Sequence, residues 1–186
     1  MSVWAVLAVI FSAGFVASMV TAARGRSTKF VGVLAGLLAV ACGWVWWNHV
    51  RLETRLATAA SKVAGVDVKV DCQEPFWGEW FVTRGDGHVN ADADGKMDDV
   101  AHLDRKICSA AGSWPENDTD EAFIAVHVLT HEAGHVRGER NEAATECWAM
   151  AHSAAVAEAL GASAQQAERR AQWYRETVYP RMSSTY

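Results

Sequence analysis

The stretch HEAGHVRGERNEAATEC, residues 131–147, holds residue types that can bind a metal and use it. His131 and His135 are four positions apart, so on a helix they share one face and can hold one zinc ion between them. Glu132 lies about 100° further round the helix, beside the metal rather than on it. A general base needs that position to take a proton from a water activated by zinc. The stretch therefore predicts a catalytic zinc site.

Helices with clear start and stop signals are expected to position these side chains. One helix is predicted to begin near Thr119 or Asp120 and to stop at Gly138, a residue type common just after helix C-termini. Asn141 is a good N-cap for the next helix, which runs through alanines to Leu160. A last helix follows and should end before the final proline.

The same stretch resembles the HExxH zinc metallopeptidases, and specifically the gluzincins, whose third zinc ligand is a glutamate from the following helix. It also resembles a stretch found in small, uncharacterised membrane-anchored proteins of actinobacteria. The resemblance implies a ligand set of His131, His135 and Glu142 for one zinc ion. It also implies that Glu132 is the base and that Glu146 is a carboxylate behind the ligands.

Two points about the ligands stay open at this stage. Glu142 and Glu146 share a helical face, so Glu146 is an alternative third ligand. His127 continues the face of the two histidines one turn earlier, where a buried histidine with a hydrogen-bonding partner is favoured over a further ligand. Asn141 occupies the position of the third histidine in the metzincin pattern HExxHxxGxxH, and asparagine is a poor zinc ligand, so that pattern is set aside.

The first 47 residues differ in composition from the remainder of the chain. Residues 3–23 and 30–47 are apolar and uncharged, and about 20 helical residues cross a hydrocarbon core of about 30 Å. We predict a transmembrane hairpin over residues 1–47 that anchors the chain in the cell membrane. Its connection, RGRSTK, carries three basic residues, which in short loops stay in the cytoplasm. The rest of the chain is therefore expected on the extracytoplasmic side.

After the hairpin, a helical linker is predicted over 48–65 and an extracytoplasmic domain over 66–186. Within that domain, VDVKVDC alternates valines with polar residues and predicts a strand over 66–72. EWFVT predicts a second short strand over 79–83, and a helix is predicted over 100–111.

Cysteine placement fits an oxidising compartment. Cys42 lies in the second apolar span, whereas Cys72, Cys108 and Cys147 lie in the outer domain. Sequence alone leaves the pairing open. A Cys72–Cys108 disulfide is preferred, because Cys147 sits beside the glutamates of the metal stretch.

Together these features predict a mainly α protein with a small β region, in which the transmembrane hairpin precedes an α-rich, metallopeptidase-like domain. The net charge of −5 gives no reason to expect nucleic-acid binding. The expected activity is zinc-dependent hydrolysis of peptide bonds in a peptide or protein substrate. The alternative is a non-catalytic, membrane-anchored module in which a structural zinc ion staples two helices for protein interaction.

Overall fold

The computed structural model describes residues 2–24, 29–73 and 86–182. The chain forms two compact units, Met1–Arg51 and Leu52–Tyr186, and the division between them falls inside a long helix. Most described residues are helical, and one small three-stranded sheet lies in the second unit. The predicted mainly α class with a small β region is therefore confirmed.

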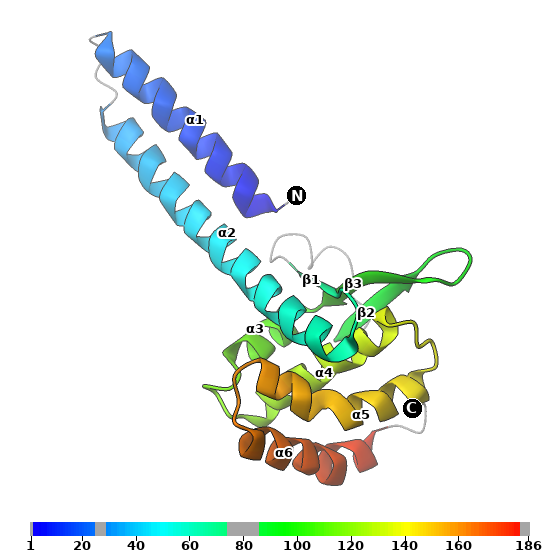
Figure 1. Cartoon of the computed structure of the whole chain (residues 1–186). Helices are drawn as coiled ribbons and strands as arrows, with labels where there is room; N and C mark the ends of the chain where they lie inside the picture. The colour runs from blue at the N-terminus through cyan, green and yellow to red at the C-terminus, as the bar shows by residue number, and fades with distance from the viewer. Residues whose placement is uncertain (1, 25–28, 74–85, 183–186) are drawn as a thin grey trace. The chain divides into compact units, whose positions relative to one another are not determined.

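The first unit consists of helix α1 (Val3–Ala23) and the beginning of helix α2 (Lys29–Ala64), as Figure 1 shows. Both helices are long and apolar enough to cross a membrane. Small residues bring them together, since a Cβ atom added to Gly32 would lie 2.7 Å from Oγ of Ser18. Glycines at such contacts let two apolar helices approach closely, which is how helices commonly pack in lipid.

The last turns of α2 belong to the core of the second unit. Leu56 and Ala60 are fully buried there. From the same turns, the Arg55 guanidinium donates hydrogen bonds to three carbonyl oxygens, of Gly112 at 3.0 Å, of Trp114 at 2.6 Å and of Leu160 at 2.8 Å. The last two are the ones that fasten α2 to the ends of other helices. Both carbonyls follow the ends of helices, where backbone oxygens lack partners within the helix. Arg55 therefore ties α2 to two later helices.

The sheet of the second unit has the strand order β1-β3-β2. Its strands are β1 (Lys69–Cys72), β2 (Gly87–Ala91) and β3 (Met97–Leu103). The central strand β3 pairs in parallel with β1 and antiparallel with β2. Val70 and Val89 lie opposite Ala101 from either side, and this apolar row packs on the core. The edge strand β2 and the central strand both contact helix α4.

Four helices follow the sheet, and each begins at a polar side chain that caps its first turn. They are α3 (Arg105–Ser113), α4 (Asp120–Val136), α5 (Glu142–Ala159) and α6 (Ala164–Trp173), after which come a π-helical segment (Tyr174–Val178) and a 3₁₀ turn (Tyr179–Arg181). Thr119 and Asn141 cap α4 and α5, as predicted. Gly138 and Gly161 follow these helices with φ angles of +105° and +110°, which glycine adopts without strain.

Helix α4 carries much of the core. Phe123, Val126 and Leu129 are fully buried, and they pack between the sheet and the neighbouring helices. Trp114 packs edge-on against Phe123, with ring centroids 5.6 Å apart, and its Nε1 donates to the carbonyl oxygen of Ala157 at 3.2 Å. The helix that bears the HExxH motif is thus held rigidly on several sides.

Three predictions about local structure have different outcomes. The strand predicted over 66–72 is found in its second half, as β1, while residues 79–83 lie outside the described part of the chain. The helix predicted over 100–111 is wrong at its start, because the first residues complete β3. Asp104 then caps α3 by accepting a hydrogen bond from the Lys106 amide at 2.7 Å, so the helix begins only at Arg105.

The preferred disulfide is confirmed. Cys72 of β1 and Cys108 of α3 form a disulfide and are both buried. Cys147 is a free, exposed thiol on α5, and Cys42 is a free, buried thiol on α2. The bridge joins the sheet to the helical layer.

Candidate metal centre

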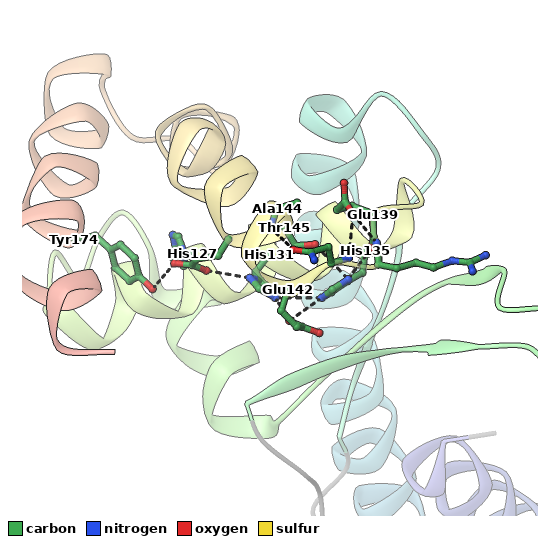
Figure 2. Close-up of polar contacts among 11 residues, drawn as sticks. His127, His131, His135, Glu139, Glu142, Ala144, Thr145 and Tyr174 are labelled. Carbon is green, nitrogen blue, oxygen red and sulfur yellow. Dashed lines mark hydrogen bonds and ion pairs between the residues drawn. The ribbon is translucent and has the colours of Figure 1, made fainter. Parts of the chain in front are cut away.

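Three side chains that can bind a metal converge where α4 and α5 meet (Figure 2). The Nε2 atoms of His131 and His135 are 3.1 Å apart. Oε2 of Glu142 lies 3.1 Å from Nε2 of His131 and 3.4 Å from Nε2 of His135. The ligand atoms of the three residues all lie within 4.8 Å of one another. Two imidazole nitrogens and a carboxylate oxygen form a donor set that zinc commonly takes, so the group could bind such an ion.

The turn between α4 and α5 sets the distance between the histidines and Glu142. Gly138 takes a left-handed conformation, and its amide donates to the carbonyl oxygen of His135 at 2.8 Å. Inside the motif, a Cβ atom added to Gly134 would lie 2.8 Å from Cγ2 of Thr145. The missing side chain at Gly134 therefore lets α5 pack closely on α4 beside the metal ligands.

Hydrogen bonds on the far side of each ring orient the two imidazoles. Nδ1 of His131 lies 3.0 Å from Oε2 of Glu146, and Nδ1 of His135 lies 2.8 Å from the carbonyl oxygen of Glu139. Both partners accept hydrogen bonds, so each Nδ1 is the donor. With each Nδ1 as a donor, both Nε2 atoms could lose any proton to a bound metal and face Glu142 as acceptors, which is the arrangement a metal ligand needs.

Glu146 is the centre of a buried hydrogen-bond network. Both of its oxygens lie 3.1 Å from Nε2 of His127, and Tyr174 donates its hydroxyl to Oε1 at 3.3 Å. The rings of His127 and Tyr174 stack with their centroids 3.8 Å apart. Burial opposes ionisation of Glu146, but hydrogen bonds from His127 and His131 outweigh it and lower the pKa to about 2. Glu146 therefore stays ionised, and His127 is the buried, hydrogen-bonded histidine that the sequence favoured.

Glu132 lies beside the ligands on α4 and is only 5% exposed. Burial raises the pKa of its carboxyl to about 7, an effect that the charge of His131 opposes and that of Glu142 reinforces. Among the described residues, Oε2 of Glu132 has no hydrogen-bond partner although it is buried. Gly87 of β2 makes room for the carboxylate, since a Cβ atom there would lie 2.9 Å from Oε1. Burying a carboxylate oxygen without a hydrogen-bond partner costs free energy. This oxygen can therefore accept a proton or a hydrogen bond from a molecule bound in the site.

The ligand group and Glu132 open to one cavity of about 700 Å³. Its walls come from α4, the edge strand β2, the turn before α5 and the C-terminal segment. Sites for small molecules are commonly about 300–1,000 Å³. The cavity over the candidate metal ligands is therefore large enough to admit a small molecule.

The structure brings together all five residues that the sequence singles out: Glu132, His131, His135, Glu142 and Glu146. Sequence reasoning missed Gly87 and Arg140, which line the same cavity. Gly87 lies far from the motif along the chain, and no periodicity connects the two. Arg140 lies inside the motif stretch, which also holds Arg137, and an arginine between Glu139 and Glu142 was the available signal.

Comparison of the chain with protein-family models, curated proteins and solved structures found no match in any of the three. A function for this chain is therefore inferred from the arrangement of the site. That arrangement consists of three candidate metal ligands, a buried carboxylate beside them and a cavity that exposes both.

Proposed function

We propose that the chain is a membrane-anchored, zinc-dependent metallopeptidase of the HExxH type, with its catalytic domain outside the cytoplasm. The observation that carries the proposal is the ligand group together with Glu132, whose buried Oε2 lacks a partner among the described residues. Both face the same cavity. A metal ion that served only to stabilise the fold would need no carboxylate in that position.

The roles follow from where the side chains lie. His131, His135 and Glu142 hold the ion, and the group offers three of the four positions of a tetrahedral site. An ion held by these residues would supply a bound water with a pKa lowered to about 7 and a Lewis acid for the carbonyl group of a peptide bond. Glu132 takes a proton from the attacking water and delivers it to the amine of the leaving fragment. The C–N bond breaks as hydroxyl adds to the carbonyl carbon and the proton adds to nitrogen, so the elements of one water are consumed.

The residues behind the ligands support the same roles. Glu146 holds His131, and the carbonyl oxygen of Glu139 holds His135, so neither ring must reorient when an ion binds. Acceptors in these positions also make an imidazole a stronger ligand, and losing one typically costs a factor of about 10 to 100 in metal affinity.

The rival function is a structural zinc site that staples α4 to α5 in a non-catalytic module. Structural sites fill all four positions with protein ligands. The two neighbours that could supply the fourth are Glu146 and Cys147. Glu146 is engaged by His127 and by Nδ1 of His131, and Cys147 is an exposed thiol. Their placement favours the catalytic hypothesis.

The proposed location rests on the N-terminal unit and on the disulfide. Two helices long and apolar enough to cross a membrane support anchoring. The basic connection RGRSTK supports a cytoplasmic loop. The Cys72–Cys108 disulfide supports an oxidising compartment for the second unit.

The test compares two variants of the full chain in detergent. Glu132→Gln keeps the shape of the side chain but cannot accept a proton, whereas His135→Ala removes a ligand. We expect Glu132→Gln to keep its zinc and its melting temperature while cleavage of a peptide library falls by a factor of about 10² to 10⁴. We expect His135→Ala to lose zinc and to melt earlier, because metal binding is coupled to folding.

Cleavage by Glu132→Gln at the parent rate would reject the peptidase proposal and leave a structural zinc site. The third ligand is tested separately. Glu142→Gln should weaken zinc binding more than Glu146→Gln, since only the Glu142 carboxylate faces both Nε2 atoms. The opposite order would exchange the two roles and leave the peptidase proposal intact.

A further inference from the structure

The cavity over the metal group runs along one face of α4. Ile124, Val128, His131 and His135 all line it, and their spacing of four, three and four positions follows one face of a helix. The eleven steps from the first to the last span about 16 Å at 1.5 Å per residue. An extended peptide rises about 3.3 Å per residue, so roughly five residues fit along this length.

The end of the cavity near the start of α4 is apolar. Ile124 and Val128 line it from α4, and Val178 and Met182 line it from the C-terminal segment. The sulfur of Met182 lies 3.4 Å from the hydroxyl of Tyr174, which fixes that segment against the site. This end suits an apolar side chain of the substrate.

The other end carries a cation. Of the described residues that line the cavity, Arg140 is the only lysine or arginine. Its guanidinium lies against the turn between β2 and β3, since a Cβ atom at Gly95 would be 2.7 Å from Nη1 of Arg140. Gly95 also has a φ angle of +76°, so both its conformation and its missing side chain let the guanidinium approach.

The backbone at Arg140 is fixed by the same turn that orients a metal ligand. The Glu139 carboxylate accepts hydrogen bonds from the amides of Arg140 at 2.9 Å and Asn141 at 3.0 Å, and the Glu139 carbonyl oxygen accepts one from His135. Within the described chain, the Arg140 guanidinium makes no ion pair. The Arg140 guanidinium is thus held near the candidate metal ligands and is not paired with a carboxylate of the protein. A guanidinium in this situation is suited to bind an anion.

We propose that Arg140 binds a carboxylate of the peptide substrate, on the side of the scissile bond that faces the β2–β3 turn. Apart from the proposed metal ion, the other charged side chains along the cavity, Asp86, Glu132, Glu142 and Glu146, are carboxylates and do not attract an anion. The preferred peptide therefore has an apolar side chain towards the C-terminal segment of the protein and a carboxylate towards Arg140. That carboxylate is either the free C-terminus or an aspartate or glutamate side chain. Cleavage of such a peptide rests on the proposed peptidase function, whereas binding of it does not.

The test measures binding to the zinc-loaded Glu132→Gln full chain in detergent, so that turnover does not interfere. The probes are fluorescent five-residue peptides with a central leucine, in matched sets. One pair has a C-terminal acid or amide, and another has glutamate or glutamine beside the leucine with the terminus amidated. We expect the acid of at least one pair to bind about 10- to 100-fold more tightly than its neutral partner. Adding Arg140→Gln should abolish that preference, and Arg140→Lys should restore part of it.

Arg137→Gln is the matched control, because Arg137 is exposed and lies over the Trp148 ring instead of lining the cavity. It should leave the preference unchanged. Equal weakening of acidic and neutral peptides by Arg140→Gln would overturn the inference and make Arg140 a support for the turn. Failure of the Glu132→Gln chain to bind either acid preferentially would also overturn it. Arg140-dependent binding without cleavage by the parent would uphold the inference and reject the peptidase function.

Discussion

His131 is the residue on which the site depends most, because both of its ring nitrogens are used. Nε2 faces Glu142 and His135, while Nδ1 is held by Glu146. Glu146 is held in turn by His127 and Tyr174, so this candidate ligand is positioned through two layers of hydrogen bonds. Because these side chains are already ordered, few of them have to be reoriented when a metal ion binds.

Replacing Tyr174 with phenylalanine tests the outer layer of this network. The change removes the hydroxyl that donates to Glu146 but keeps a ring that can stack on His127. We expect zinc affinity to fall by up to about tenfold and the free energy of unfolding to fall by about 1 kcal/mol. Competition with a chelator measures the zinc affinity. Thermal unfolding of the metal-free chain measures the free energy of unfolding.

Tyr179→Phe is the control, since Tyr179 packs on the same core and, among the described residues, makes no hydrogen bond to Glu146. It should leave zinc affinity unchanged. If Tyr174→Phe binds zinc as tightly as the parent, His127 alone is sufficient to hold Glu146.

At this scale the sequence predicted which residues lie together but could not rank two of them as metal ligands. Glu142 and Glu146 are one turn apart on the same face of α5, so spacing treats them alike. Their difference comes from packing. The Glu146 side chain is almost fully buried against His127, whereas that of Glu142 is 56% exposed and reaches the Nε2 side of the histidines.

The edge strand β2 is the element that completes the site. It passes so close to α4 that only glycine fits at position 87, where Cβ would meet Cγ and Oε1 of Glu132 at 2.9 Å and Cδ2 of Leu103 at 3.0 Å. The strand thus confines the Glu132 carboxylate. Neither β2 nor this contact was predicted from the sequence.

We expect Gly87→Ala to displace Glu132 without disturbing zinc. The three heavy atoms nearest to the added methyl group belong to Glu132 and Leu103, and none of them belongs to His131 or His135. A displacement of about 1 Å at a catalytic group can cost a factor of about 100 in rate. Zinc content should stay at the parent level while kcat falls.

A double-variant cycle shows whether the methyl group acts through Glu132. If it does, Gly87→Ala combined with Glu132→Gln should be no slower than Glu132→Gln alone. Additive losses would instead place the effect on substrate binding along β2.

The strand β3 shows why element boundaries were harder to predict than helices α4 and α5. Those helices carry their own caps and glycine stops, which are local signals. Strand β3 contains Asp98 and Asp99, which disfavour strands, and its pairing with β1 joins Lys69 to Val100 across a long stretch of chain. Long-range pairing leaves no local pattern, so the start of a helix was predicted there instead.

On the scale of the whole second unit, an ion-pair cluster fastens the last helix to the motif helix. Arg170 of α6 pairs with Asp118 and with Asp120, the latter at 2.7 Å, and Arg169 pairs with Asp118 at 3.1 Å. Burial tends to raise the pKa of Asp118, but its hydrogen bond and ion pair with Arg170 outweigh burial and lower it. The contribution of Asp118 to this cluster is therefore present only while its carboxyl group is ionised.

We expect Asp118→Asn to lower the free energy of unfolding by about 1 kcal/mol at neutral pH, the upper range for a partly exposed ion pair. Because the folded pKa lies below the unfolded value, the stabilisation is complete above about pH 4 and disappears as the pH falls through the folded pKa. Thermal unfolding of parent and variant at pH 7, 5, 4 and 3 should give curves that converge at the acid end. A constant difference at all pH values would mean that the carboxylate charge is not the cause.

The orientation of the whole molecule in a membrane can be tested with a residue that the fold already exposes. Cys147 is a free, exposed thiol beside the metal group, Cys72 and Cys108 are joined, and Cys42 is buried. A maleimide that cannot cross membranes should therefore react with the native chain at Cys147. Labelling then depends on which side of the membrane the second unit occupies.

We expect intact cells that make the full chain to be labelled at Cys147, because the basic connection between the two apolar helices favours a cytoplasmic loop and places the second unit outside. Cys147→Ser should abolish the signal, which shows that neither Cys42 nor the disulfide contributes. Permeabilised cells provide the upper limit of labelling. A signal that arises only after permeabilisation would place the candidate peptidase site in the cytoplasm. Its substrates would then be cytoplasmic, and the disulfide would need an explanation other than an oxidising compartment.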